Sequence, residues 1–258
     1  MAVLRPLIIA AVLIGSWQAF VVLTGQPNYI LPAPTAVAAQ IVARFDILVG
    51  HFAVTATEIL LGLVCGAVLG AAAALTLAYF RGARQWLLPP LVVSQAVPVF
   101  ALAPVLTLWV GYGIASKIAM AALIIFFPVT AAFFDGLRRT EPAWLDQARV
   151  MGASRWRTLR YLQLPAALPA CASGLRVAAA FAPIGAIVGE WVGASSGLGY
   201  LMLHANGRGQ VDVMFAALVL LAAFSVALYF TVDHVLRRLL PWQPDQWGGS
   251  RLVATTQG

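Results

Sequence analysis

The sequence predicts an all-α integral membrane protein with six transmembrane helices and both termini in the cytoplasm. Of its 258 residues, 62% are hydrophobic and only 10% are charged, whereas an average soluble domain carries about 25% charged residues. Apolar runs of about 18 residues or more recur along the chain, and each is long enough to cross a bilayer as a helix. One soluble core could not bury six such runs, so the composition excludes a soluble protein.

The apolar runs locate the six spans. We expect them at Pro6–Leu23, Phe52–Phe80, Trp86–Val110, Ile114–Leu137, Ala166–Val192 and Asp212–Leu239. The first run also has features of a signal peptide, because it closely follows Arg5. However, it is long, no clear A-x-A cleavage site follows it, and further spans come after it, so we expect a retained helix.

A short helix is expected between the first two spans. The segment Leu31-Pro32-Ala33-Pro34-Thr35 leads into Ala36 to Leu48, where apolar residues recur at helical spacing. Thr35 is a residue type that caps helices, and a short apolar helix beside a span is typical of the membrane interface. We therefore predict an interfacial helix that Thr35 caps.

The distribution of basic residues predicts the orientation. If the N-terminus is cytoplasmic, twelve of the sixteen Lys and Arg residues lie in the inner segments. Only Arg44, Lys117 and Arg208 lie in the outer segments, and Arg176 lies within a span. Such an excess of positive charge marks the cytoplasmic side. The net charge of +7 therefore follows from the topology, and no nucleic-acid partner is needed to explain it.

Small residues predict where the helices pack closely. The second span carries Gly62, Gly66 and Gly70 at intervals of four, continued by Ala74, and a stripe of this kind marks a tight contact within the subunit or across a dimer. The third span carries four prolines, and the fifth carries Gly174, Pro183, Gly185, Gly189 and Gly193. We expect both to be interrupted and to line a pathway; ordinary kinks are the alternative.

Polar groups inside the spans are candidate pathway residues, because each is costly in a bilayer unless it is paired or hydrated. The predicted pathway residues are Glu58, Ser94, Gln95, Pro98, Glu190 and Trp191. For Glu190 the alternative is placement at the membrane boundary beside Trp191. For Glu58 and Arg176 the alternative is structural pairing with a neighbouring helix.

Several chemistries find no support in the sequence. The phosphate-binding pattern G-x-x-x-x-G-K-[ST] is missing, and the one lysine, Lys117, follows Ser116. No zinc spacing of histidines occurs, and Cys65 and Cys171 lie far apart in apolar runs. We therefore expect no metal site, no cofactor in this chain, and two cysteines that are buried as small apolar residues.

One pattern suggests an enzyme. The run Gly193-Ala194-Ser195-Ser196-Gly197 matches the G-x-S-x-G nucleophile pattern of serine hydrolases, with His204 or His234 as the base. His234 lies 22 residues into the last span, about 33 Å along a helix, and His204 has no obvious carboxylate to orient it. An ordinary turn of small residues is therefore favoured over a membrane serine hydrolase.

The most polar inner segment, residues 138–165, predicts two short helices. Pro142 suits a first helical turn, Gly152 interrupts the chain, and Ser154 can cap a second helix that Pro165 ends. Leu145, Ala148 and Met151 share one face of the first helix. A compact, amphipathic and basic helix pair is typical of a docking element for another protein; a connector held against anionic lipid headgroups is the alternative.

This segment resembles the EAA loop of ABC importer permeases. That pattern is E-A-A, three residues, Gly, nine residues, Ile, any residue and Leu-Pro. Here Asp146-Gln147-Ala148 is followed at the same spacings by Gly152, Leu162 and Leu164-Pro165. The departures are Asp146 for Glu, Gln147 for Ala and Leu162 for Ile, and the shorter Asp146 puts the ATPase contact there in doubt.

The resemblance extends over nearly the whole chain. The nitrate/sulfonate/taurine branch of these permeases has motifs like Leu31-Pro32-x-Pro34, Ala103-Pro104 through Trp109-x-Gly111-x-Gly113, Ser116-Lys117 and Gly197-Leu198-Gly199-Tyr200. Within that branch, the subgroup for thiamine-precursor pyrimidines or riboflavin has motifs like Thr57-Glu58 and Ser94-Gln95-x-x-Pro98.

The resemblance implies a single permease domain, residues 1–258, of the type I (MetI-like) class, with a polar cytoplasmic tail at 241–258. It implies a multi-pass protein of the bacterial inner membrane that imports a small polar solute. It further implies a homodimer that is bound to ABC ATPase subunits, which hold ATP and Mg²⁺, and that receives solute from a periplasmic or lipid-anchored binding protein. This chain would then not itself be an enzyme.

The residues that would transmit ATPase motion are Asp146, Ala148, Arg149, Gly152, Ala153, Arg155, Leu162, Leu164 and Pro165. The alternative to an ABC importer is a secondary transporter or channel. Such a protein would need no ATPase and would often show internal repeats, which this sequence lacks.

Overall fold

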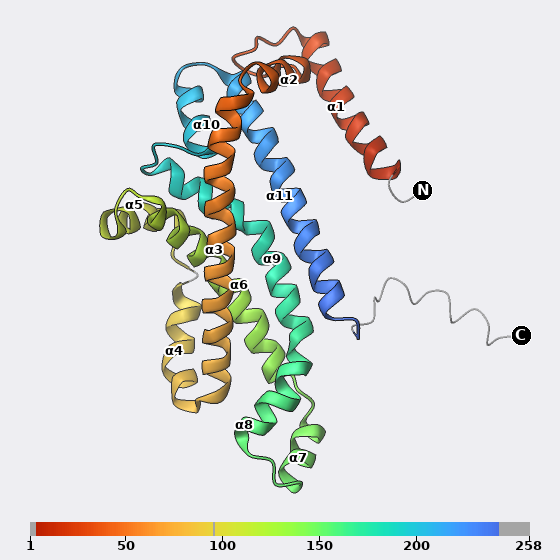
Figure 1. Cartoon of the computed structure of the whole chain (residues 1–258), viewed down its shortest axis with the longest axis vertical. Helices are drawn as coiled ribbons and strands as arrows, with labels where there is room; N and C mark the ends of the chain where they lie inside the picture. The colour runs from red at the N-terminus through yellow and green to blue at the C-terminus, as the bar shows by residue number, and fades with distance from the viewer. Residues whose placement is uncertain (1–3, 95, 243–258) are drawn as a thin grey trace, which may run out of the picture.

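The computed structural model describes residues 4–94 and 96–242, and these residues form helices and no strands (Figure 1). The α-helices in chain order are α1 (Leu4–Thr24), α2 (Pro34–Ala43), α3 (Phe45–Tyr79), α4 (Arg81–Ser94), α5 (Val99–Val110), α6 (Ile114–Arg138), α7 (Pro142–Val150), α8 (Arg155–Thr158), α9 (Leu164–Trp191), α10 (Leu198–Gly207) and α11 (Val211–Leu239). A π-helical turn, Leu159–Gln163, joins α8 to α9.

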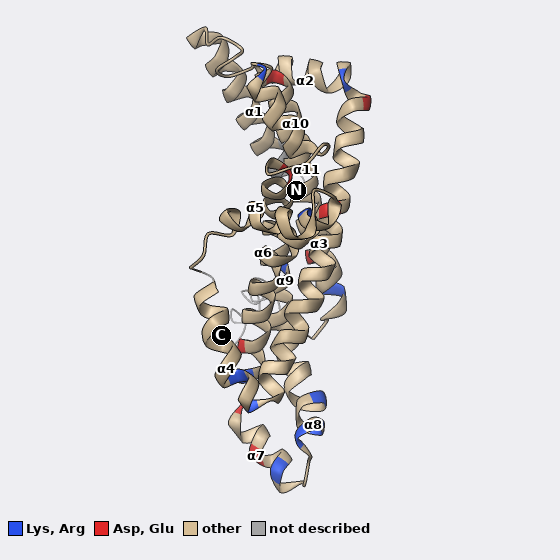
Figure 2. Cartoon of the chain, turned by 90° about the vertical axis from the view of Figure 1, so that its left-hand side faces the viewer, with Lys and Arg blue, Asp and Glu red and all other residues tan. Residues whose placement is uncertain are grey.

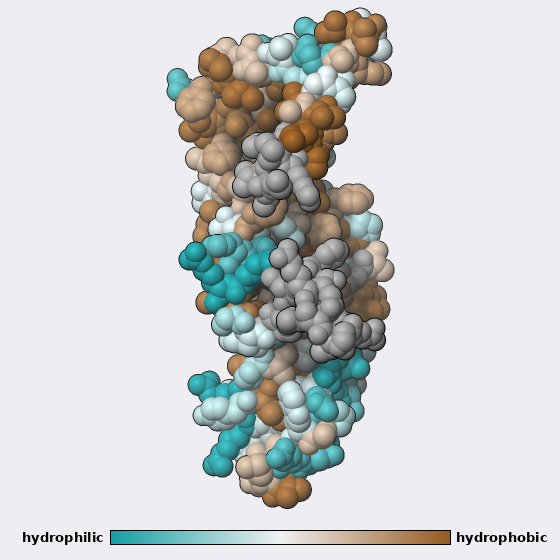
Figure 3. Space-filling model, turned by 90° about the vertical axis from the view of Figure 1, so that its right-hand side faces the viewer, coloured by the Kyte–Doolittle hydropathy of each residue, from teal (hydrophilic) through white to brown (hydrophobic). Residues whose placement is uncertain are grey.

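The helices form an elongated bundle with two different ends. Helices α7 and α8 project from one end, whereas α2 and α10 lie at the other (Figure 1). We call these the α7–α8 end and the α10 end. Lys and Arg gather at the α7–α8 end (Figure 2). On the face seen in Figure 3, hydrophobic residues dominate towards α10 and hydrophilic residues towards α7 and α8.

Four described helices are long and apolar enough to cross a membrane. They are α3, α6, α11 and the continuous helix formed by α8, the π-helical turn and α9. A fifth span results if α4 and α5, which meet at 106°, count together. The apolar part of α1 within the described chain, Ile8–Thr24, is shorter than this standard, so the sixth span and the orientation stay predictions.

Helix α6 is the centre of the packing, because α3 and α9 contact it from two sides. A Cβ added to Gly66 of α3 would lie 2.7 Å from the carbonyl oxygen of Ala122, and one added to Gly185 of α9 would lie 2.6 Å from the Cα of Ala121. Neither helix could approach α6 so closely with larger residues. The predicted glycine stripe of α3 therefore makes a contact within the subunit.

Helix α9 differs from the prediction, because the fifth span is continuous. Pro183 lies inside the helix, and the backbone remains helical through it to Trp191. The glycines of this span make close approaches instead: a Cβ on Gly174 would lie 2.6 Å from the Cβ of Ala132, and one on Gly189 would lie 3.2 Å from the Cα of Lys117. The third span is interrupted as predicted, between α4 and α5.

Three further predictions are wrong in detail. The interfacial helix ends at Ala43 rather than Leu48, and α3 begins at Phe45, so the second span is longer than expected. Thr35 lies inside α2, whose N-cap residue is Ala33 with no side-chain cap. Cys65 is exposed on α3 rather than buried, and Cys171 is half-buried.

Candidate functional site

Two regions gather the predicted functional residues. One is the α7–α8 segment, residues 142–163, at one end of the bundle. The other is a cluster of polar side chains at the base of α10, which comprises the half-buried His51 and the buried Thr55, Glu58, Lys117 and Glu190. The two regions are joined by one helix, because the helix that begins at Arg155 runs without a break to Trp191.

Local sequence explains how α7 begins and ends. Pro142 occupies its first turn, where a missing backbone N–H costs nothing. At its end Gly152 has φ +71°, its N–H donates to the carbonyl of Arg149 at 2.9 Å, and the N–H of Ala153 donates to the carbonyl of Ala148 at 2.9 Å. These two bonds form a Schellman motif, which requires a left-handed residue and therefore favours glycine.

The connection to α8 is also as predicted. The Ser154 side chain accepts a hydrogen bond from the backbone N–H of Arg157 at 3.3 Å and so caps α8. The prediction that Pro165 ends this helix is wrong. Pro165 lies in the first turn of α9, and the helix passes through the π-helical turn into the span. Proline is tolerated there because the π-helical turn just before it, in which the N–H of Leu164 donates to the carbonyl of Leu159, already interrupts the regular α-helical bonding.

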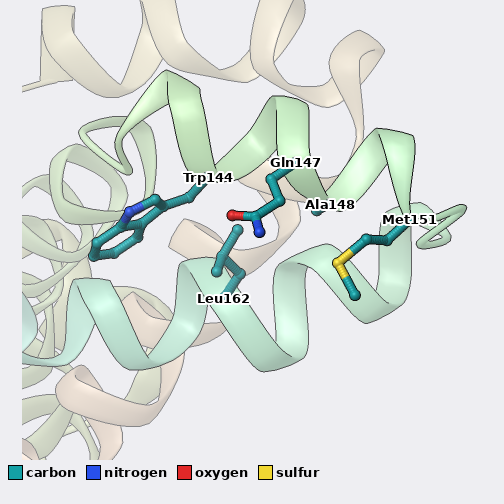
Figure 4. Close-up of a pocket in the computed structure, with 5 residues that line it drawn as sticks. All are labelled: Trp144, Gln147, Ala148, Met151 and Leu162. Carbon is teal, nitrogen blue, oxygen red and sulfur yellow. The ribbon is translucent and has the colours of Figure 1, made fainter.

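A pocket separates α7 from the π-helical turn. It has a volume of about 460 Å³ and is lined by Trp144, Gln147, Ala148, Met151 and Leu162. Figure 4 shows the Gln147 and Leu162 side chains pointing towards each other across it, with Trp144 to one side of them and Met151 to the other. The apolar residues at the tip are uncovered, since Met151 is 78% exposed. An apolar tip in a basic, solvated segment is a surface on which another protein can dock.

The remaining predicted coupling residues lie in this segment or directly after it, at the start of α9. Asp146 and Arg149 form an exposed ion pair, with the carboxylate 2.7 Å from the guanidinium. Arg155 lies over the ring of Tyr79 at 5.7 Å. Leu164 and Pro165 each line a further pocket beside the segment.

At the opposite end, the start of α10 is held by side chains from α3 and α9. The N–H of Gly197 donates to His51 Nδ1 at 3.0 Å, and the N–H of Leu198 donates to Thr55 Oγ1 at 2.7 Å. The N–H groups of Gly199 and Tyr200 donate to Glu190 Oε2 at 2.5 and 3.2 Å. The first amides of a helix have no partners within it, and here all four are satisfied.

Glu190 is the central acceptor of this arrangement. It is 1% exposed, and its second oxygen accepts a hydrogen bond from the Thr55 hydroxyl at 2.6 Å. A carboxylate at the start of a helix also interacts favourably with the helix dipole. A Cβ on Gly197 would overlap the Glu190 carboxyl, and one on Gly199 would lie 2.8 Å from it. The absence of side chains at Gly197 and Gly199 therefore leaves room for the Glu190 carboxylate.

Lys117 supplies positive charge beside this carboxylate. It is 2% exposed, and its Nζ donates to the carbonyls of Tyr112 at 2.7 Å and Gly193 at 2.9 Å. It thereby joins the turn before α6 to the turn after α9. The charge distribution of the sequence places Lys117 in an outer segment, whereas the structure places it in this cluster. The sequence feature that indicates a buried, paired lysine here is its position three residues into an apolar span.

Glu58 is the unsatisfied member of the cluster. It is 2% exposed, and its Oε2 has no hydrogen-bond partner among the described residues. Its carboxyl lies close enough to that of Glu190 for a hydrogen bond when one of the two is protonated, and close enough to Lys117 to interact with its charge. A buried polar atom without a partner is uncommon and marks a place where strain, an ion or a solute contact is expected.

The other predicted pathway residues lie apart from this cluster. Ser94 ends α4 and Pro98 precedes α5, and both are exposed at the bend between these helices. Trp191 is 50% exposed at the end of α9. Gln95 lies outside the described residues. For Arg176, the alternative of structural pairing with a neighbouring helix is observed, because its guanidinium pairs with Asp233 of α11 at 2.7 Å.

The G-x-S-x-G run lies in the turn between α9 and α10. Its last glycine donates to the ring of His51, not to His204 or His234. His204 contacts its own helix through the carbonyl of Tyr200. No described hydrogen bond joins Ser195 or Ser196 to a histidine, so the residues we named for a hydrolase are not assembled in this structure.

Comparison with known proteins matches these features to one family. Residues 62–241 match the family described as "Binding-protein-dependent transport system inner membrane component". A probable ABC transporter permease protein of Haemophilus influenzae is 55% identical over 92% of this chain and 97% of its own length. The formylaminopyrimidine transport permease ThiX of Halalkalibacterium halodurans is 34% identical over 94% and 97%. The riboflavin transport permease RibX of Chloroflexus aurantiacus is 37% identical over 88% and 85%.

The fold is also found among solved structures. The inward-facing MetNI methionine ABC transporter contains a chain that matches 76% of this one and 97% of its own length, with a TM-score of 0.66 and 20% identity. Such a likeness shows the fold alone. Together with the family match and the long relatives, it shows that this chain belongs to the binding-protein-dependent transport system inner membrane components, as a multi-pass permease subunit of an ABC importer.

Proposed function

We propose that this permease drives import by transmitting the motion of ATPase subunits from the α7–α8 segment to the α10 end. The observation that carries this proposal is the continuous helix from Arg155 to Trp191, 37 residues long or about 55 Å at 1.5 Å per residue. Its first turn belongs to the docking segment, and Glu190 near its last turn holds α10. A displacement at one end would therefore act on the other.

The π-helical turn is the place where this helix can adjust. Turns of this kind inside long helices are often found at functional sites. Here the turn spans Leu159–Gln163, immediately between the exposed segment and the span. Rocking of such rigid elements about a bistable interface is the ordinary way in which transporters alternate access.

The proposal includes the partners and the orientation. Two copies of this chain would sit on two ATPase subunits, with the α7–α8 end in the cytoplasm and the α10 end facing a solute-binding protein. The concentration of Lys and Arg at the α7–α8 end supports this orientation (Figure 2). ATP and Mg²⁺ would be bound by the partners.

The proposed solute is a small nitrogen heterocycle of the pyrimidine or riboflavin kind. The relatives named for these solutes are 34% and 37% identical to this chain, whereas a putative aliphatic sulfonates permease of Bacillus subtilis is 30% identical. Binding measurements on the cognate binding protein test this choice. Tight binding of a pyrimidine or flavin supports it, and binding of a sulfonate instead contradicts it.

Within the permease, the proposed pathway contains Glu58, Ser94, Gln95, Pro98, Glu190 and Trp191. Glu58 is the sharpest case, because its Oε2 is buried without a partner. We expect Glu58→Gln, which keeps the size and hydrogen-bonding capacity but removes the charge, to change solute uptake while the transporter still assembles. Uptake kinetics equal to those of the wild type would remove Glu58 from the pathway.

A pair of glycines provides a matched test of docking. Gly152 and Gly209 have φ +71° and +70°, and a Cβ on either would meet nothing within 4 Å. Gly209 ends α10 with the same pattern of bonds, from its own N–H to Asn206 and from the N–H of Gln210 to Ala205. The two sites differ in which end of the bundle they occupy.

We expect Gly152→Trp to abolish co-purification of the ATPase and Gly209→Trp to leave it intact. The backbone strain is the same at both positions, so a difference between them reports a partner at the α7–α8 end. Membrane insertion is checked for both variants by their yield in the membrane fraction. Normal recovery of the ATPase with Gly152→Trp would refute the docking role.

A further inference from the structure

Beside the docking segment lies a second pocket, between the end of α3 and the start of the α8 helix. It has a volume of about 490 Å³. Leu75 and Thr76 of the span line it on one side, and Leu159 and Arg160 line it on the other. It is thus built partly from α3, a membrane-spanning helix, and partly from the basic α7–α8 segment.

Aromatic side chains form the rim of this pocket. Tyr79 and Trp156 meet edge to face, with ring centroids 6.1 Å apart, while Phe80 and Trp156 are 56% and 57% exposed. Exposed Tyr and Trp at the end of a span are typical of the level of the lipid headgroups. The pocket therefore opens at the level where the apolar and polar parts of a phospholipid meet.

The charge at the rim is positive and unbalanced. Arg160 lines the pocket, and the guanidinium of Arg155 lies 5.7 Å from the centre of the Tyr79 ring. Among the described residues, no acidic side chain lines the pocket or pairs with either arginine. The ion pairs of this end involve other arginines, such as Arg149 with Asp146.

We propose that this pocket binds an acidic phospholipid, with the phosphate at Arg155 and Arg160 and an acyl chain along Leu75 and Leu159. Basic pockets between helices on the cytoplasmic side are suited to anionic headgroups. A lipid there would contact both α3 and the start of the helix that leads to Glu190. The inference rests on the proposed orientation, which puts this pocket in the cytoplasmic leaflet.

Quenching of Trp156 fluorescence tests the proposal directly. The full-length chain is reconstituted into phosphatidylcholine vesicles that contain a minor share of either brominated phosphatidylglycerol or brominated phosphatidylcholine. The difference between the wild type and Trp156→Phe isolates this residue from the other tryptophans. We expect brominated phosphatidylglycerol to quench Trp156 at lower content than brominated phosphatidylcholine does.

Arg157 provides the matched control for charge. It lies on the same one-turn helix as Arg155 and is exposed. Unlike Arg160 it does not line the pocket, and it does not share the position of Arg155 over the Tyr79 ring at the rim. We expect Arg160→Gln and Arg155→Gln each to weaken the preference for phosphatidylglycerol about fivefold, which corresponds to about 1 kcal/mol per basic residue at an anionic surface. Arg157→Gln should not change how Trp156 quenching depends on the content of brominated phosphatidylglycerol.

Three results would overturn the proposal. The first is equal quenching by the two lipids in the wild type, and the second is a loss with Arg157→Gln as large as with Arg160→Gln. The third is disappearance of the quenching in the assembled transporter, which would show that a protein covers the pocket. The binding measurement needs neither ATP nor a partner. Loss of ATPase co-purification alone would therefore contradict the proposed function and leave the lipid site standing.

Discussion

The two ends of the bundle differ in whether side chains cap the first backbone amides of a helix. At the α10 end, four successive amides from Gly197 to Tyr200 are satisfied by side chains of α3 and α9. At the α7–α8 end, α7 begins at an exposed Glu141 whose side chain makes no capping bond. The first amides of α10 are thus satisfied inside the subunit, whereas those of α7 have no side-chain cap and are available to a partner.

This difference assigns different roles to similar motifs. Helices α7 and α10 both end in a Schellman motif with an open left-handed glycine, so their local stability at that point is alike. What separates them is the environment, since Glu190 is 1% exposed and the Asp146–Arg149 pair is 67% and 75% exposed. Substitutions at the α10 end should therefore affect folding, and substitutions at the α7–α8 end should affect assembly.

The largest effect is expected from Glu190→Ala. It leaves the amides of Gly199 and Tyr200 and the hydroxyl of Thr55 without their buried acceptor, and a single hydrogen bond to a charged group contributes about 1.5–3 kcal/mol. We expect the free energy of unfolding in detergent to fall by at least about 3 kcal/mol. Glu141→Ala is the matched control at the other end and should change it by less than about 0.5 kcal/mol. Equal losses would show that the two ends do not differ.

A smaller effect is expected from Gly197→Ala. Gly152 has φ +71°, where alanine costs about 1–2 kcal/mol. Gly197 has φ +113° and ψ 162°, a region that is essentially restricted to glycine and where alanine costs about 1–3 kcal/mol. At Gly197 the new Cβ would also overlap the Glu190 carboxyl, which adds about 1–3 kcal/mol of overpacking. In thermal unfolding, the melting temperature of Gly197→Ala should be lower than that of Gly152→Ala. The reverse ranking would mean that the carboxyl moves aside without loss.

Next in size is Thr55→Val, which removes the hydroxyl that bridges Leu198 and Glu190 but keeps the shape of the side chain. We expect a loss of about 1–2 kcal/mol in the free energy of unfolding. Thr57 is the neighbouring control, because it is exposed and its hydroxyl bonds only to the carbonyl of Ala53 in its own helix. If Thr57→Val lowers the free energy of unfolding by as much as Thr55→Val does, loss of the hydroxyl bridge between Leu198 and Glu190 is not the cause of the Thr55→Val effect.

The smallest effect on stability is expected from Asp146→Asn. The substitution breaks an exposed ion pair with Arg149, and such pairs contribute about 0–1 kcal/mol. The melting temperature should stay unchanged, while ATP hydrolysis by the assembled transporter should respond less to solute-loaded binding protein. A clear drop in melting temperature with normal coupling would reverse the roles that we assign to the two ends.

The α7–α8 segment could be predicted from sequence almost residue by residue, because its devices are local. Pro142, Gly152 and Ser154 act within a few residues of themselves, through a first turn, a Schellman motif and a cap. Only the end of the second helix was wrong. Pro165 was expected to stop it, but Pro165 follows the π-helical turn, where the regular α-helical bonding is already interrupted, and the helix continues.

The α10 end could not be predicted in the same way, because its contacts join distant residues. Glu190 and Thr55 lie 135 residues apart, and spacing along the chain does not reveal such pairs. The glycines of α9 predict an interruption of the span, but in the structure they do not interrupt it and instead let α6 approach closely. Pro183 removes one hydrogen bond, whereas breaking the helix would leave several backbone groups unsatisfied in lipid, so the helix continues.

The most direct measurement of the central claim is purification of the wild-type permease from its native membrane, followed by solute uptake in vesicles. We predict that an ABC ATPase co-elutes in stoichiometric amount and that uptake requires ATP and the binding protein. A permease that purifies without an ATPase and moves solute down an ion gradient would contradict the account and identify a secondary transporter.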